Sequence, residues 1–358
     1  MAALPVIADE LHPASIRARN IFSENLPKLL LIVEEKLNIE LRLCVQEKFC
    51  SSPELIKEVN EYFGSLLQTV YDLNLRQAFV HESANISYSL LKQDFDPSFF
   101  PRFLEAWIIA INSTIDPQAA SELTQPLIWL SRIFSKLDAS KCPAFEPLDK
   151  DQQAFLDLLL RQQRRQAAQY LLQRLKKVHS PEPLFSQIMI PALHRLGLLW
   201  QERTINVAAE HAATEICRYA ILRLCDVVPI AKMGPYAAIV SCVPGEEHEL
   251  GALIVANLLE LSGFRVIYLG HSLPESDILY AIDEENPDFI FLSVTLLINL
   301  PATKRLIEMI QGQEKHPQVV LGGYAVQFDD SADLKPDFCA ANIKQGIEYA
   351  MSKAGNNA

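Results

Sequence analysis

"AAIVSCVPGEEHELGALIVANLLELSGFRVIYLG" (Ala237–Gly270) is the stretch that decides the fold of the C-terminal part of the chain. Two short apolar runs, rich in β-branched residues, enclose a longer run whose apolar residues recur at helical spacing. Strands that are apolar on both faces and alternate with helices are typical of a parallel sheet covered by helices on each side. The stretch therefore predicts a strand, a helix and a second strand of a doubly wound α/β domain.

The same alternation continues toward the end of the chain. The runs "DFIFLSVT" (288–295), "QVVLGGY" (318–324) and "DFCAANI" (337–343) are predicted strands, and helical patterns separate them. Residues 233–358 are therefore expected to form a Rossmann-like domain. In such sheets ligands bind beyond the carboxyl ends of the strands, where the strand order reverses. The residues directly after each strand are for this reason the first candidates for a functional site.

Glycine usage separates this domain from a helical N-terminal region. Only Gly64 and Gly197 precede residue 234, although the chain has 12 glycines. A chain that avoids glycine over such a length is mostly helical. The expected fold class is therefore α followed by α/β. The predicted helices cover 25–38, 53–73, 97–111 and 120–137, and then 150–178, 183–200 and 206–226.

Two helical domains are expected in this region. Two prolines and several charged residues interrupt the helical pattern at 138–151 and predict a linker. We expect an all-helical domain at 1–148, serving dimerisation or the binding of a second ligand. A smaller helical bundle at 149–232 would lead into the sheet domain at 233–358.

Composition indicates an ordinary globular protein. Hydrophobic residues make up 49% and charged residues 21% of the chain. No apolar run approaches the roughly 20 residues that cross a bilayer, so no membrane span is expected. The first residues lack the basic start and apolar core of a signal peptide, which favours a cytoplasmic protein. The seven cysteines form no CxxC pair, and we interpret them as reduced, mostly buried thiols rather than disulfides or zinc ligands.

The charge distribution argues against direct nucleic-acid binding. The net charge is −12, and residues 237–358 alone carry 17 acidic against 7 basic side chains, a balance of −10. Such a surface repels a phosphate backbone. The basic run Arg161–Lys177 is interpreted as the solvated face of one helix, with Arg161 and Arg165 one turn apart. A partner site on that face is the alternative.

His248 lies between the first predicted strand and its helix, with Glu246 two residues before it and Gly251 three after it. A histidine on such a loop can reach a metal, and a nearby carboxylate can accept its second ring N–H. This contact fixes the tautomer and raises the basicity of the ligating nitrogen. Gly251 would let a bulky ligand approach the backbone. The alternative for His248 alone is an ordinary surface histidine.

The ends of the third and fourth strands add small and hydroxyl-bearing residues. Ser293 and Thr295 supply hydroxyl groups, and Gly322 and Gly323 supply an absence of side chain. Together with the first loop they predict a deep slot for a flat or long ligand. The first loop lacks G-x-G-x-x-G, so a dinucleotide site is disfavoured.

These three motifs resemble those of the cobalamin-binding domain, whose pattern is D-x-H-x-x-G, then S-x-L or S-x-T, then G-G. The resemblance spans residues 235–358. It implies that His248 is the lower ligand of cobalt in place of the cofactor's own dimethylbenzimidazole. It also implies that the displaced nucleotide tail fills the slot lined by Ser293 and the glycine pair. Glu246 stands where the family has aspartate.

The segment before the sheet narrows the resemblance. Trp200 is followed after nine residues by Glu210-His211, and Asn206 is a predicted helix N-cap between them. This W-x9-EH pattern is similar to the cap bundle of light-sensing, adenosylcobalamin-binding regulators of the CarH type. The resemblance implies that Trp200, Glu210 and His211 cover the upper face of the corrin. The family has histidine directly after the tryptophan, where this chain has Gln201, so an upper histidine ligand at that position is not implied.

Residues 1–148 carry no recognisable DNA-binding helix-turn-helix. The layout loosely resembles cobalamin photoreceptors of the photocobilin type, which implies biliverdin as a second cofactor in or near this domain. His81, Trp107 and Trp129 are the residues considered for such a pocket. Aromatic residues at helical spacing are also typical of a helical core, and that alternative stays open.

The sequence thus predicts a cobalamin-binding light sensor rather than an enzyme, holding adenosylcobalamin. Photolysis would alter the cap bundle and the association between chains, which implies a homo-oligomer and a downstream signalling protein. One alternative is a corrinoid methyl-carrier protein of a methyltransferase system, which would share His248. Another is a protein–protein antirepressor whose slot is empty or holds haem. Taken singly, Trp200 also suits a core anchor and His211 an ordinary helix histidine.

Overall fold

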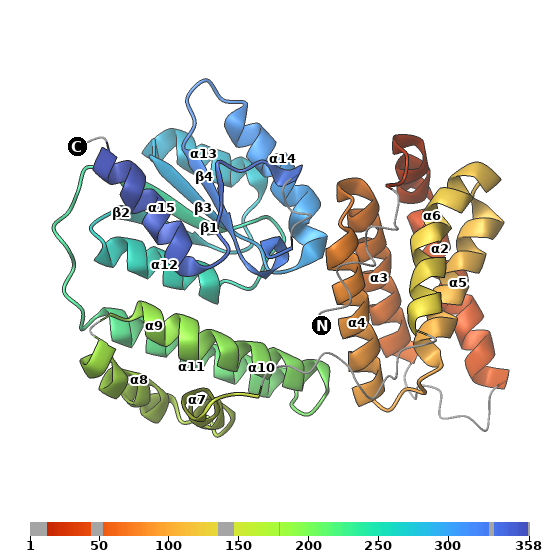
Figure 1. The fold of residues 1–358 in the computed structure, drawn as a ribbon, viewed down its shortest axis with the longest axis horizontal. Helices are drawn as coiled ribbons and strands as arrows, with labels where there is room; N and C mark the ends of the chain where they lie inside the picture. Colours follow the sequence, from red (N-terminus) through yellow and green to blue (C-terminus); the bar gives the residue numbers. More distant parts are fainter. Residues whose placement is uncertain (1–12, 44–52, 135–146, 179, 329–332, 357–358) are drawn as a thin grey trace. The chain divides into compact units, whose positions relative to one another are not determined.

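The computed structural model describes residues 13–43, 53–134, 147–178, 180–328 and 333–356 (Figure 1). The chain divides into two compact units, Met1–Phe145 and Glu146–Ala358. Among the residues described, no helix is both long enough and apolar enough to cross a membrane. Most of the linker predicted at 138–151 falls outside the described ranges.

The first unit is helical throughout its described part. Its core is aromatic: Phe22, Phe63, Phe103 and Trp107 are all fully buried, and the rings of Phe63 and Trp107 lie 6.0 Å apart. The structure therefore shows Trp107 as part of the core. The helices are α2 (Ile16–Leu43), α3 (Pro53–Leu73), α4 (Arg76–Lys92), α5 (Phe99–Thr114) and α6 (Pro117–Phe134).

The second unit begins with a helical bundle. Two of its helix starts have the caps that the sequence supports. Asp149 and Gln152 form a capping box, and Asn206 accepts a hydrogen bond from the Ala209 amide at 2.9 Å, which confirms the predicted N-cap. The bundle consists of α7 (Lys150–Leu160), α8 (Arg164–Val178), α9 (Glu182–Leu184), a π-helical turn η2 (Phe185–Met189), α10 (Ile190–Gln201) and α11 (Val207–Cys225).

The prediction of one helix over 150–178 is wrong. The chain breaks between α7 and α8, where Gln162 adopts a left-handed conformation with φ of 55°. Its amide bonds to the Leu159 carbonyl at 2.9 Å, and the Gln163 amide bonds to the Leu158 carbonyl at 2.9 Å. This pair of bonds is a Schellman motif, which ends a helix. Arg161 therefore does not share a helix face with Arg165.

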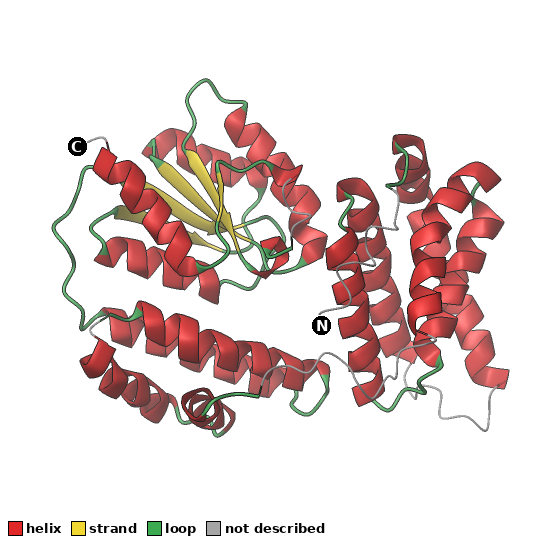
Figure 2. Cartoon of the chain, in the orientation of Figure 1, coloured by secondary structure: helices red, strands yellow, loops and turns green. Residues whose placement is uncertain are grey.

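A five-stranded parallel sheet follows, with strand order β2-β1-β3-β4-β5. Figure 2 shows the strands enclosed by helices, and the expected Rossmann-like architecture is confirmed. The strands are β1 (Ala237–Cys242), β2 (Arg265–Gly270), β3 (Phe289–Ser293), β4 (Gln318–Gly322) and β5 (Phe338–Cys339). The helices are α12 (Leu250–Leu261), α13 (Glu275–Glu285), α14 (Leu300–Gln311) and α15 (Ile343–Asn356), with 3-10 turns η3 (Leu297–Asn299) and η4 (Tyr324–Val326).

One hydrophobic core runs from the bundle through α12 and α15 to the sheet. Bundle and sheet thus belong to one compact unit, and the expected division at residue 232 stays a proposal. Of the cysteines that the structure describes, Cys217, Cys225 and Cys242 are buried and Cys339 is exposed, all as free thiols.

The strand order reverses between β1 and β3, which lie next to each other at the centre of the sheet. Ligands of such sheets bind beyond the carboxyl ends of the strands at this reversal. The turn that carries His248 follows β1, and the loop that carries Thr295 follows β3. The fold therefore brings two of the predicted motifs to the position where a ligand is expected.

Candidate functional site

A tight turn after β1 presents His248 and hides Glu246. Gly245 in this turn has φ of 81°, a conformation that favours glycine. Glu246 is fully buried, whereas the His248 side chain is 55% exposed. The Glu246 Oε1 atom lies 2.5 Å from His248 Nδ1 and 3.0 Å from the His248 amide nitrogen. The longer glutamate thus makes the contact that the family pattern assigns to aspartate.

The other carboxylate oxygen of Glu246 is held by the loop after β3. It accepts hydrogen bonds from the amides of Thr295 at 2.8 Å and Leu296 at 2.9 Å, and from the Asn299 side chain at 3.1 Å. Burial alone would raise the pKa of Glu246. The hydrogen bonds from His248, Leu296 and Thr295 outweigh burial and lower this pKa to about 2.

An ionised Glu246 fixes the state of the His248 ring. Because the carboxylate can only accept, His248 Nδ1 donates to it, and the hydrogen bond raises the pKa of His248 against the opposing effect of burial. The remaining Nε2 has no hydrogen-bond partner among the described residues and is then a more basic ligand atom on an exposed side chain. These donor and acceptor atoms fit the lower ligand of a corrinoid cobalt.

The slot residues lie on adjacent strands. Ser293 pairs with Gly322 across β3 and β4. A Cβ atom at Gly251 would lie 3.7 Å from Ser293 Oγ, an ordinary van der Waals distance, so Gly251 and Ser293 are direct neighbours. Gly322 adjoins Ala340, whose carbonyl oxygen would be 3.9 Å from an added Cβ. The fold thus brings Gly251, Ser293 and Gly322, which the sequence predicted as slot residues, next to one another.

Two slot residues have roles that differ from those expected. Gly323 has φ of 118°, and a Cβ there would collide with the Val294 carbonyl group. Glycine is required at this position by the backbone, whatever a ligand requires. Thr295 contributes its main-chain amide to Glu246, whereas the sequence suggested its hydroxyl group.

The predicted cap residues lie on α10 and α11. Trp200, in the last turn of α10, is 45% exposed. On α11, His211 Nδ1 lies 2.9 Å from Glu210 Oε2, and Thr214 donates to Glu210 Oε1 at 2.8 Å. The charge of Glu210 contributes to the raised pKa of His248, so the two side chains are within electrostatic reach.

Sequence reasoning missed a polar cluster beside this site. Glu249 follows His248 directly, and its carboxylate accepts hydrogen bonds from Arg218 on α11 and from Tyr268 on β2, the latter at 3.0 Å. His271 Nε2 lies 3.5 Å from the same carboxylate. The spacing of Arg218 seven residues after His211, two turns along one helix face, was the available signal. The cluster joins α11 to the loop that carries His248.

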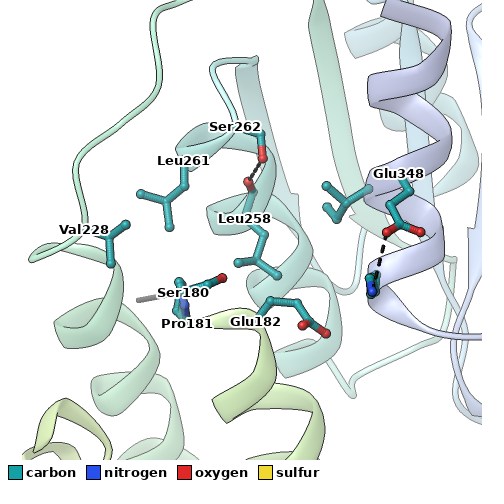
Figure 3. Close-up of a pocket in the computed structure, with 10 residues that line it drawn as sticks. Ser180, Pro181, Glu182, Val228, Leu258, Leu261, Ser262 and Glu348 are labelled. Atoms are coloured by element: carbon teal, nitrogen blue, oxygen red, sulfur yellow. Dashed lines mark hydrogen bonds and ion pairs between the residues drawn. The ribbon is translucent and has the colours of Figure 1, made fainter. Parts of the chain in front are cut away.

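A separate cavity of about 270 Å³ lies at the C-terminal end of α12, whereas His248 precedes its N-terminal end (Figure 3). Leu258 and Leu261 of α12, Val228 and Ile347 form its apolar wall. The 12-residue α12 is about 18 Å long at 1.5 Å per residue, and His248 precedes its first turn. None of the predicted site residues lines this cavity.

Known protein families match both the helical bundle and the sheet of the second unit. A family described as "B12 binding domain" matches residues 236–343, and a second family with the same description matches residues 152–224. The two matches cover the sheet and the helical bundle before it. Cobalamin is therefore the class of cofactor that this unit takes.

Two relatives represent different classes of B12 protein. The chain is 33% identical over 113 residues to the "HTH-type transcriptional repressor CarH" of Myxococcus xanthus, covering 32% of this chain and 37% of the repressor. It is 30% identical over 164 residues to "Dimethylamine corrinoid protein 3" of Methanosarcina mazei, covering 44% of this chain and 97% of that protein. The name of the repressor conflicts with the expected absence of a nucleic-acid partner, which remains a proposal.

The solved structure of the Methanosarcina barkeri monomethylamine corrinoid protein shows the same fold. Its TM-score is 0.50 at 14% identity, and the match covers 57% of this chain and 98% of that one. The sequence resemblance to cobalamin-binding proteins is thus confirmed by family matches, by a relative covered almost end to end and by the fold. This chain belongs to the B12 binding domain family.

Proposed function

We propose that the chain is a light sensor that holds adenosylcobalamin with His248 as the lower axial ligand of cobalt. The observation that carries this proposal is the exposed His248 imidazole, fixed by the buried Glu246 carboxylate at 2.5 Å and located where the strand order reverses. The similarity to CarH supports a regulator, and the proposal assigns the chain no catalytic turnover.

Each predicted residue has a role in this proposal. Glu246 orients the ligand ring, while Gly251, Ser293, Thr295 and the glycine pair Gly322-Gly323 border the slot for the nucleotide tail. Trp200, Glu210 and His211 cover the upper face. Bound adenosylcobalamin supplies a cobalt–carbon bond that visible light breaks.

The output follows from the exposure of the cap. Trp200 is 45% exposed, so an upper ligand would give its ring an apolar partner. Loss of that ligand would release the ring, relax α10 and α11, and change the association between chains. The proposed partners are further copies of this chain and a signalling protein rather than DNA, because residues 237–358 carry a balance of −10.

The proposal includes biliverdin as a second cofactor of the N-terminal unit. Among the described residues of this unit, the buried atoms without a hydrogen-bond partner include Asn60 Oδ1, Ser83 Oγ and Trp107 Nε1. Buried polar atoms without a partner are uncommon, and a bound polar ligand is the explanation that this part of the proposal assigns to them. Spectral titration of the full chain with biliverdin, followed by Ser83→Ala and Trp107→Phe variants, tests this part independently.

A corrinoid methyl carrier is the second candidate function. The match to a dimethylamine corrinoid protein covers 97% of that protein and favours this alternative. A methyl carrier would share His248 and Glu246 but would need no cover for a bulky upper ligand. The two candidates therefore differ in their response to light.

The deciding experiment reconstitutes the full chain with adenosylcobalamin in darkness and then illuminates it with green light. A light sensor changes its visible spectrum and its elution volume in size-exclusion chromatography. His248→Ala should lose the spectrum of the bound cofactor, whereas His316→Ala, a histidine on the loop before β4, should match the wild type. An unchanged spectrum and elution volume in the wild type would contradict light sensing and favour the methyl carrier.

A further inference from the structure

The cavity at the C-terminal end of α12 lies between helices of the bundle and helices that cover the sheet. Its apolar wall is formed by Pro181, Val228, Leu258, Leu261 and Ile347. Its volume of about 270 Å³ is almost twice the roughly 150 Å³ of an apolar protein cavity that holds benzene. Sites for small molecules are mostly apolar hollows, often located at domain interfaces or between helices. The cavity therefore has the size and the lining for one small molecule of up to two fused rings.

The main-chain acceptors at this end of α12 are already engaged. The Leu261 carbonyl oxygen accepts a hydrogen bond from the Ala231 amide at 2.9 Å. The Leu258 carbonyl oxygen accepts one from the Ser262 hydroxyl group at 2.7 Å. A ligand that donates hydrogen bonds would therefore find its partners among the side chains of the rim.

The rim of the cavity carries two carboxylates and one ammonium group (Figure 3). Lys344 and Glu348, one turn apart on α15, form an ion pair of 3.7 Å. The Glu182 side chain has neither an ion pair nor a hydrogen bond with another described residue. One negative charge is thus left uncompensated beside an apolar wall. An ammonium group attached to an apolar body complements both features.

We propose that this cavity binds a small organic cation, an amine with an apolar body of up to two fused rings, whose ammonium group pairs with Glu182. The apolar body lies against Val228, Leu258 and Leu261. The site goes beyond the proposed light sensing and does not depend on it, since none of the residues assigned to cobalamin lines the cavity. A bound amine contacts the bundle and the sheet helices together, and it therefore stabilises their packing.

Isothermal titration of the full chain loaded with hydroxocobalamin tests this site, with tryptamine as the probe. Loading keeps the cobalamin slot occupied, so the amine cannot enter it. We expect one tryptamine per chain. Indole-3-acetate has the same rings and the opposite charge, and it should bind at least about tenfold more weakly, because it loses the charged hydrogen bond and meets an unpaired carboxylate.

Two pairs of variants locate the site. Val228→Trp should fill the cavity and abolish tryptamine binding, whereas Val227→Trp, at the exposed neighbour, should bind as the wild type does. Glu182→Gln should weaken binding about tenfold, as expected for the loss of a charged hydrogen bond. Glu260→Gln, at an exposed carboxylate of α12 outside the cavity, should leave the affinity unchanged.

A further variant reverses the sign of the effect. Lys344→Met should strengthen tryptamine binding, because Glu348 then lacks its ion-pair partner and adds to the negative charge of the rim. Absence of tryptamine binding in the wild type overturns the proposal, and so does equal affinity for indole-3-acetate or unchanged affinity in Val228→Trp. Circular dichroism checks folding, and Leu261→Phe serves as the filling variant if Val228→Trp does not fold.

Discussion

Gly251 and Gly323 lack a side chain for different reasons. Gly323 adopts φ of 118°, where an L-amino acid is strained, and an added Cβ would collide with the Val294 carbonyl group. Gly251 lies in the first turn of α12 in an ordinary conformation, and an added Cβ would have only Ser293 Oγ within 4 Å, at 3.7 Å. The first glycine serves the fold, and the second leaves space at the proposed slot.

Alanine at these two positions should therefore change different properties, namely the stability of the fold at Gly323 and the affinity for cobalamin at Gly251. Gly323→Ala is expected to reduce the free energy of unfolding by about 3 kcal/mol, because it combines left-handed strain with a backbone clash. Gly251→Ala should melt within 2 °C of the wild type, roughly the spread of neutral surface changes, yet bind cobalamin more weakly. Thermal unfolding and equilibrium dialysis measure the two quantities. Normal cobalamin affinity in Gly251→Ala would show that the ligand does not use this space.

The buried carboxylate also predicts how stability depends on pH. In the unfolded chain Glu246 takes up a proton near its ordinary pKa of 4.5, whereas in the folded chain it stays ionised down to about 2. Its contribution, of order 3 kcal/mol, is thus present above pH 4.5 and is lost as the pH falls toward 2. For the protein prepared without cobalamin, the free energy of unfolding should therefore fall more steeply with decreasing pH in the wild type than in Glu246→Gln. Glu247→Gln, at the exposed neighbour, should behave as the wild type.

At the scale of the elements, the break between α7 and α8 is held by a residue poorly suited to it. A left-handed glutamine costs about 1–2 kcal/mol relative to a right-handed conformation, and glycine avoids that cost. Gln162→Gly should therefore raise the free energy of unfolding by about 1 kcal/mol, since part of the gain is offset by the freedom of glycine in the unfolded chain. Chemical denaturation measures the change. Gln163→Gly, at the next position, should be neutral or destabilising, and equal stabilisation by both would contradict this explanation.

The contact between Arg218 and Glu249 predicts a coupling between α11 and α12. Arg218→Met keeps the length of the side chain and removes its charge, leaving Glu249 with Tyr268 and His271. Amide hydrogen exchange in the first turn of α12 should become about tenfold faster, because a partly buried ion pair is lost. Arg223→Met, at an exposed arginine of the same helix, is the control. Unchanged exchange in Arg218→Met would show that α11 and α12 open independently.

The elements were predictable where their signals are local. The strands could be located from runs of apolar residues, and the Asn206 cap from one residue type next to a helical pattern. The end of α7 was missed because neither glycine nor proline marks it, and the π-helical turn η2 has no sequence signature. Helix boundaries that depend on main-chain bonding rather than on residue type lie beyond such patterns.

The residue proposed to bind cobalt could be predicted from the sequence, whereas the residues that hold the surrounding side chains in place could not. His248 and Glu246 are two residues apart, and this spacing together with the family pattern was enough to propose their contact. Asn299 lies 53 residues from Glu246, and Arg218 lies 31 residues from Glu249. Such partners become apparent only when the strand order places β1 beside β3 and the bundle beside α12. The residues that orient a ligand are therefore harder to find in sequence than the ligand itself.

At the scale of the whole molecule, the contribution of each unit to cobalamin binding can be tested separately. The unit Glu146–Ala358 contains the complete B12 match and one continuous core. A fragment of residues 146–358 should therefore fold and bind cobalamin with the affinity of the full chain. Isothermal titration of both proteins measures this. A fragment that folds but binds at least tenfold more weakly would show that the N-terminal unit contributes to the cobalamin site.

Glu249 gives this arrangement a reciprocal property. It is joined to His248 by a single peptide bond, and its carboxylate is held by a helix of the cap. If cobalamin binding changes the free energy of a rearrangement of that helix, thermodynamic linkage requires that the rearrangement change the free energy of cobalamin binding by the same amount. A protein that binds to this helix would then change how tightly the corrinoid is retained. Loading and release of the cofactor would therefore depend on the same partner protein whose binding the cofactor influences.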